Sequence, residues 1–88
     1  MSFFVYILRT SSDTLYIGQT NDLEKRIKEH KEKSSRSSKY VRYFSSVELV
    51  YHEIHKTRGE AIQREIQLKK LSKSEKEALI KGDLNILK

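Results

Sequence analysis

Residues 3–30, FFVYILRTSSDTLYIGQTNDLEKRIKEH, contain two short apolar runs followed by an amphipathic helical pattern. The first run, residues 3–9, is apolar at both odd and even positions, which predicts a central strand covered on both faces. Residues 10–14 are typical of a turn, and residues 15–19 return as a second strand, so the two runs predict a β-hairpin. Gly18, near the end of the second strand, predicts a close approach by another backbone or by a ligand.

Each of the two predicted strands contains a tyrosine, Tyr6 in the first and Tyr16 in the second. Side chains alternate between the faces of a strand, so the tyrosines share a face only if the hairpin loop has an odd number of residues or a bulge intervenes. A three- or five-residue loop over residues 11–13 meets this condition. The hairpin can therefore present both phenols on one face.

A helix is predicted directly after the hairpin. Asn21 reads as its N-cap with Glu24 as a capping-box partner, and the amphipathic pattern continues to about residue 32. Arg26 and His30 are four residues apart and lie together at the edge of the apolar face. Both side chains can therefore lean over the sheet.

The middle of the chain combines cations with aromatic side chains, which nucleic-acid surfaces use for charge and stacking. Residues 21–44 hold eight Lys/Arg against four Asp/Glu, so +4 of the formal net charge of +6 lies there. The serine-rich residues 33–39 predict either a plain linker or a basic flap on phosphates, and the aromatic residues that follow could also fill a small core. The predicted nucleic-acid-binding residues are Lys25, Lys39, Tyr40 and Arg42.

The second half of the chain predicts one strand and two helices. Residues 47–54 alternate as a half-buried strand with one wetter face. Thr57 with Glu60 and Ser72 with Glu75 form capping boxes that begin helices ending near residue 70 and near Gly82. The order of elements is therefore β-β-α-β-α-α, and residues 81–88 are expected to form a frayed tail.

Bulk composition favours one globular domain over residues 1–88. The chain is 36% hydrophobic and 34% charged, contains no cysteine and has only three histidines, which disfavours disulfides and a zinc cage. No run approaches the roughly 18 apolar residues of a membrane span and no leader pattern is present, so we expect a cytoplasmic protein without a membrane partner. The net charge favours a polyanionic partner.

Glu65 does not fit the pattern of its predicted helix. On a helical wheel with Ala61 at 0°, it falls at about 40°, in the middle of an apolar stripe. That stripe consists of Ala61, Ile62, Ile66 and Leu68. Because an unpaired buried carboxylate is costly, Glu65 is expected either to form an ion pair with Arg26 or Lys69 or to bind a hard cation. A single carboxylate completed by waters and substrate phosphate is a usual way to hold Mg²⁺.

Five residues supply the groups that phosphodiester hydrolysis needs: a base for water, charge neutralisation at the phosphate and help for the leaving oxygen. Arg26 offers a planar fork that matches phosphate oxygens. A tyrosine could act as the base if a nearby cation lowered its pKa, and His30 could orient it or move a proton. The candidate catalytic set is Tyr6, Tyr16, Arg26, His30 and Glu65.

The order of these motifs resembles the GIY-YIG nuclease domain over roughly residues 3–80. The matching motifs are Val5-Tyr6-Ile7, Tyr16-Ile17-Gly18, Leu23-x-x-Arg26-x-x-x-His30, and Ala61 followed by Arg64-Glu65; the stretches Lys39-Tyr40-x-Arg42 and Glu48-Leu49-Val50-Tyr51 are similar to those of the small stand-alone bacterial members. The first half-motif departs from Gly-Ile-Tyr, so Tyr6 is matched by its place in the strand.

The resemblance implies an α+β fold with a three-stranded antiparallel sheet flanked by helices. It also implies one divalent ion, Mg²⁺ or Mn²⁺, bound by Glu65, with Arg26 on the scissile phosphate. By the same match either Tyr6 or Tyr16 is the general base or positions the water, and His30 assists. The larger family members join this domain to a separate DNA-binding module, which we do not expect in this protein.

Three functions remain open from the sequence. The first is a metal-dependent DNA endonuclease acting in DNA repair or recombination, without a small-molecule cofactor and with a protein partner or a homodimer for targeting. The second is a non-catalytic nucleic-acid-binding module that retains the nuclease fold, which predicts salt-dependent binding indifferent to Mg²⁺. The third is a protein-interaction domain, in which replacing Glu65 changes only stability.

Overall fold

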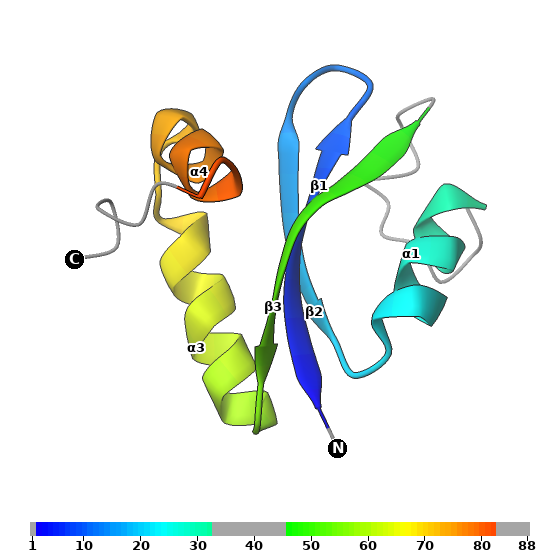
Figure 1. Ribbon diagram of the computed structural model, residues 1–88, viewed down its shortest axis with the longest axis vertical. Coiled ribbons are helices and arrows are strands. Elements are labelled where there is room, and N and C mark those ends of the chain that lie inside the picture. The colour runs from blue at the N-terminus through cyan, green and yellow to red at the C-terminus, as the bar shows by residue number, and fades with distance from the viewer. Residues whose placement is uncertain (1, 33–45, 83–88) are drawn as a thin grey trace.

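The computed structural model describes residues 2–32 and 46–82, which form an α+β fold. Three antiparallel strands lie between helices on both sides (Figure 1). The elements are β1 Phe3–Thr10, β2 Leu15–Thr20, α1 Leu23–Lys31, β3 Val47–His55, α3 Arg58–Lys69 and α4 Lys73–Ile80. The predicted fold class and element order are confirmed, and none of the helices described here has the length and apolar character to span a membrane.

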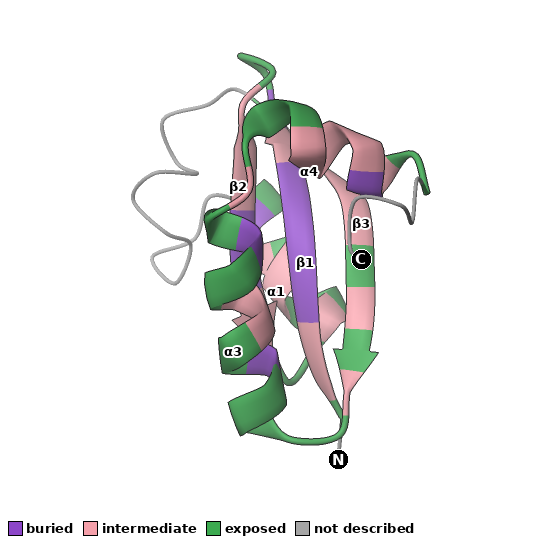
Figure 2. Cartoon of the chain, turned by 90° about the vertical axis from the view of Figure 1, so that its left-hand side faces the viewer, coloured by how far each residue is buried: buried purple, intermediate pink, exposed green. Residues whose placement is uncertain are grey.

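β1 is the central strand, as its apolar pattern predicts, and the order in the sheet is β2-β1-β3. The four consecutive side chains from Val5 to Leu8 are at most 1% exposed, so β1 is buried on both faces (Figure 2). α3 and α4 cover one face of the sheet, and α1 covers the other (Figure 1). The described part of the chain therefore has two small cores, one on each face of β1.

The two cores differ in character. The core under α3 and α4 is aliphatic and consists of Val5, Ile7, Ile17, Ala61, Leu68 and Leu79. The core under α1 is built on Tyr6 and Leu8, against which Leu23 and Ile27 of α1 pack. The apolar face predicted for the first helix is therefore confirmed, and it packs on a tyrosine.

The hairpin loop places both tyrosines on the α1 face. Leu8 lies opposite Tyr16 and Tyr6 lies opposite Gly18, so the loop spans three residues, 11–13. Asp13 closes it with a φ of 61°, a conformation that short aspartate side chains tolerate. The odd-numbered loop expected from strand alternation is confirmed, because Tyr6, Leu8 and Tyr16 share one face.

The predicted half-buried strand with one wetter face is confirmed as β3, but its alternation is interrupted once. Ile7 lies opposite Tyr51 and Leu8 lies opposite Leu49, which leaves Val50 as the extra residue of a β-bulge. Before the bulge Leu49 faces the α1 core, and after it Tyr51 faces the α3 core. One strand thus contributes to both cores.

Helix caps agree with the sequence at two of three starts. The predicted N-cap Asn21 is wrong. The cap is Asp22, whose carboxylate accepts from the Lys25 amide at 3.2 Å, three residues further on. Thr57 caps α3 by accepting from the Glu60 amide at 3.1 Å, which is one half of the predicted capping box, whereas Ser72 and Glu75 form the reciprocal box at the start of α4. α4 ends at Ile80, beside Gly82 as expected, while residues 83–88 of the predicted tail lie outside the described residues.

Candidate active site

Three of the predicted site residues meet on the α1 face: Tyr6 of β1, Tyr16 of β2 and His30 of α1. Their ring centroids are 6.5 Å apart for the two tyrosines, 6.0 Å for Tyr6 and His30, and 5.7 Å for Tyr16 and His30. The Tyr6 hydroxyl is hydrogen-bonded to His30 Nε2 at 3.0 Å, and both residues are 1% exposed. Tyr16 is half-buried and closes the cluster at the edge strand.

Gly18 makes room for the Tyr6 ring. A Cβ atom added at Gly18 would lie 2.5 Å from the Tyr6 hydroxyl oxygen and 2.7 Å from Cζ. The close approach predicted at this glycine is therefore real, but a cross-strand side chain makes it, and the expectation of a backbone or a ligand is wrong. The reason is register, since Gly18 lies directly opposite Tyr6.

Burial determines the protonation of the central pair. Loss of hydration raises the pKa of Tyr6 to about 12; the Arg26 guanidinium opposes this shift in part, and the Glu65 carboxylate adds to it. Burial lowers the pKa of His30 to about 4, and the positive charge of Arg26 contributes. At neutral pH the phenol therefore keeps its proton and the imidazole is neutral.

Arg26 lies beside this pair on α1, with its side chain 25% exposed. Its Nη1 donates to Glu29 Oε1 at 3.2 Å. Burial by itself would lower the pKa of Arg26, but contacts with Tyr6 and Glu29 outweigh it and raise the pKa. Glu29 was missed from the sequence, although its i,i+3 spacing from Arg26 on a helix was a usable signal.

The apolar stripe predicted on α3 is wrongly centred. Ile62 and Ile66 are 40% and 50% exposed, so they lie outside the core. Arg64 instead turns toward the sheet, where its Nε donates to Glu53 Oε1 of β3 at 2.7 Å. Glu65 consequently lies at the edge of the buried face, with its side chain 19% exposed.

Glu65 forms an ion pair with Lys69, one of the two partners left open by the sequence, with Nζ and Oε2 2.7 Å apart. Its charge also acts on the Tyr6 phenol, although α3 and α1 lie on opposite faces of the sheet. Residues 2–32 and 46–82 hold no cluster of three or more His, Cys, Asp or Glu suited to a metal. A lone carboxylate such as Glu65 fits only an ion whose other ligands are water and substrate oxygens.

Of the four predicted nucleic-acid-binding residues, the structure describes one. Lys25 is exposed on α1 and lines a shallow depression together with Asp22, Glu24 and Lys28. Two carboxylates there offset the two lysines, so this surface has no excess of positive charge. Lys39, Tyr40 and Arg42 lie outside the described residues.

Residues 2–78 match the GIY-YIG catalytic domain, and the chain belongs to the GIY-YIG nuclease family, as its motifs indicated. It is 44% identical over 77 residues to a UPF0213 protein of Clostridium perfringens, covering 88% of this chain and 81% of the relative. The UPF0213 protein YazA of Bacillus subtilis is 37% identical over 82 residues, covering 93% and 81%. The solution NMR structure of a UPF0213 protein from Bacillus halodurans is similar with a TM-score of 0.59 and 33% identity, over 92% of this chain and 84% of that one.

Proposed function

We propose that the protein is a divalent-metal-dependent endonuclease that hydrolyses phosphodiester bonds in DNA, in repair or recombination. The observation that carries the proposal is the buried Tyr6–His30 pair, with Tyr16 and Arg26 beside it. Membership of a nuclease family supports DNA as the substrate class.

Arg26 is the residue proposed to bind the scissile phosphate. Its guanidinium presents a planar fork of donors that matches two phosphate oxygens. The ion pair with Glu29 holds the side chain on the tyrosine side of α1 and leaves it partly exposed to a substrate. The positive charge beside the cluster would stabilise the charge that develops on the phosphate during attack.

The two tyrosines are proposed to have different roles because their surroundings differ. Tyr6 is buried with a pKa of about 12, so it holds its proton and is a poor base. Tyr16 lies half-buried on the edge strand, where water has access. We therefore propose that Tyr16 is the tyrosine that positions or deprotonates the attacking water. The neutral His30 fixes the Tyr6 ring through the 3.0 Å hydrogen bond.

Glu65 is proposed to hold one Mg²⁺ or Mn²⁺. The bound ion would polarise the phosphate and stabilise the leaving oxygen. Lys69 neutralises the Glu65 carboxylate in the structure, so the ammonium group and the ion compete for the same oxygens. Metal affinity in the absence of DNA should accordingly be weak.

The test is nicking of supercoiled plasmid and of a branched DNA by wild type, Glu65→Gln and Glu60→Gln, each with Mg²⁺, Mn²⁺ or EDTA. Glu60 is a matched control because it is an exposed glutamate on the same helix. We expect metal-dependent nicking by wild type and Glu60→Gln, and a loss of about 100-fold or more in Glu65→Gln, the scale of removing one charge-stabilising group.

Two results would contradict the proposal. A folded wild type that binds DNA but never cleaves it would support the non-catalytic nucleic-acid-binding module. Equal cleavage by wild type and Glu65→Gln would remove Glu65 from the metal site.

A further inference from the structure

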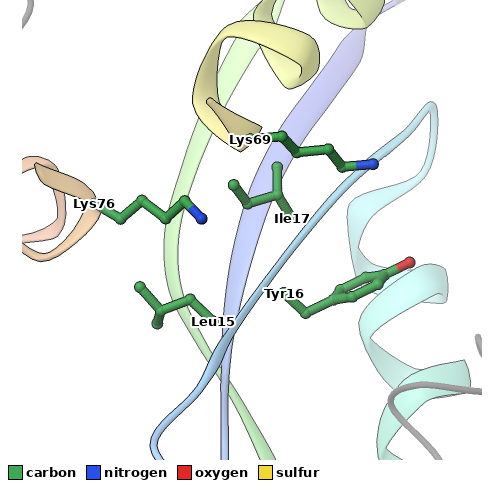
Figure 3. Close-up of a pocket in the computed structure, with 5 residues that line it drawn as sticks. All are labelled: Leu15, Tyr16, Ile17, Lys69 and Lys76. Atoms are coloured by element: carbon green, nitrogen blue, oxygen red, sulfur yellow. The ribbon is translucent and has the colours of Figure 1, made fainter. Parts of the chain in front are cut away.

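A second cationic site lies on the other side of β2 from the tyrosine cluster. It is a pocket of about 190 Å³ lined by Leu15, Tyr16, Ile17, Lys69 and Lys76. In Figure 3 the Lys76 side chain reaches from α4 toward Ile17, the Lys69 side chain runs from α3 past Ile17, and the Tyr16 ring points toward α1. Tyr16 therefore belongs to both sites, and the edge strand β2 is all that separates them.

The pocket has an excess of positive charge. Its lining contains two lysines and no carboxylate. Lys69 is neutralised by Glu65, but Lys76, which is half-buried, forms no ion pair with any residue in the described part of the chain. An ammonium group that has no counter-charge beside it attracts an anion more strongly than one that is neutralised by a carboxylate.

The floor of the pocket is apolar, since Leu15 and Ile17 belong to or pack against the aliphatic core. Cations above an apolar floor fit a ligand in which charged and apolar groups alternate. The backbone of a nucleic-acid strand has this form, with a phosphate on every nucleotide and a sugar between phosphates. A small inorganic anion would use the lysines and leave the floor uncovered.

We propose that this pocket is a phosphate-binding subsite for the DNA strand that continues from the cleavage point, with Lys76 as its principal contact. The inference rests on the proposed nuclease function and extends it by giving the strand a path. The strand crosses the β2 edge from Arg26 on the α1 side to Lys76 on the α4 side, and passes Tyr16 between them. Lys69 joins the contact when its carboxylate partner is otherwise engaged.

The test compares Lys76→Gln with Lys81→Gln. Lys81 lies just after α4, is exposed and does not line the pocket, so both variants lose one charge from the same part of the chain. Binding of a fluorescent DNA duplex is measured by anisotropy in EDTA, between about 50 and 200 mM salt. We expect Lys76→Gln to reduce the slope of log K against log[salt] by about 1, and Lys81→Gln to leave it within about 0.3 of wild type.

A third variant, Lys76→Arg, separates charge from packing. It keeps the cation, so it should retain the wild-type slope even if the melting temperature changes. The subsite would be overturned if Lys76→Arg changed the slope as much as Lys76→Gln does. It would also be overturned if Lys76→Gln and Lys81→Gln gave equal slopes. Wild type that cleaves DNA while the subsite fails leaves the proposed function standing, whereas wild type that neither binds nor cleaves DNA overturns both.

Discussion

Tyr6 is at once a core residue and a residue of the candidate site. Its ring fills the core under α1, and its hydroxyl forms the hydrogen bond to His30. Burial keeps the phenol protonated, and the absence of a side chain at Gly18 leaves the space for it. Changes around this tyrosine should therefore alter folding and activity together.

Replacing Gly18 by alanine tests this coupling. The new Cβ would lie 2.5 Å from the Tyr6 hydroxyl oxygen, so the ring must shift, and the shift disturbs its hydrogen bond to His30. We expect a loss of about 1–3 kcal/mol in the free energy of unfolding, measured by urea denaturation, together with reduced nicking.

Gly59 provides the control, since a Cβ there meets nothing closer than Thr57 Oγ1 at 4.0 Å. Gly59→Ala, in the first turn of α3, should raise stability by about 0.5–1 kcal/mol because alanine is the better helix former. A destabilisation of Gly18→Ala no larger than a few tenths of a kcal/mol would show that Tyr6 adapts freely.

His30 should make stability depend on pH. Its pKa is lowered to about 4 in the folded chain, against about 6.5 when unfolded, so between these values the unfolded state binds more protons. Stability is therefore full above pH 6.5 and falls as the pH drops toward 4. Between pH 7.5 and 4.5 we expect a loss of about 2–3 kcal/mol, measured by denaturant unfolding across the range.

The assignment of this effect to His30 is checked by two variants. His30→Gln should flatten the curve between pH 6.5 and 4.5, whereas His52→Gln, at an exposed position of β3, should keep the wild-type dependence. Retention of the full slope in His30→Gln would assign the titration to another group.

At the scale of the elements, α3 is oriented by polar contacts to β3. The Glu53 carboxylate accepts from Arg64 Nε, is hydrogen-bonded to His55 Nε2 at 2.8 Å, and accepts from the Tyr51 hydroxyl. Burial favours the neutral acid, but these three contacts outweigh it and lower the pKa of Glu53. The cluster fixes the rotation of α3, and with it the direction of Glu65, the residue next to Arg64.

A double-mutant cycle measures this contact. Glu53→Gln, Arg64→Gln and the double variant should give a coupling free energy of about 1–2 kcal/mol, because both side chains are less than one-fifth exposed. The matched cycle for Lys28 and Glu32, an exposed pair 4.0 Å apart, should give no more than about 0.5 kcal/mol. Similar values for the two pairs would show that Glu53 does not orient α3.

At the scale of the whole molecule, features set by neighbours in the sequence were predictable. Strand alternation and the three-residue loop place Tyr6 and Tyr16 on one face, and helical spacing places Arg26 beside His30. Features that depend on a distant partner were not. The rotation of α3 needs Glu53, eleven residues before Arg64, and the bulge at Val50 is set by pairing with β1.

The same distinction applies to the candidate sites. The Lys76 pocket is lined by residues from β2, α3 and α4, so no residue spacing within a single element could predict it. Lys69 was one of the two ion-pair partners predicted for Glu65, because the i,i+4 spacing can be read from the sequence. Whether that ion pair forms cannot be read from the spacing alone.

The position of β2 at the edge of the sheet has a consequence for self-association. Within the residues that the structure describes, no strand pairs with its outer side, and an open strand edge is where aggregation through intermolecular pairing begins. Lys76, which has no counter-charge among the described residues, lies beside that edge, so two copies approaching there repel each other. A bound DNA strand would neutralise this repulsion, but it would also cover the edge of β2. The edge would therefore be protected by charge in the free protein and by the DNA in the complex.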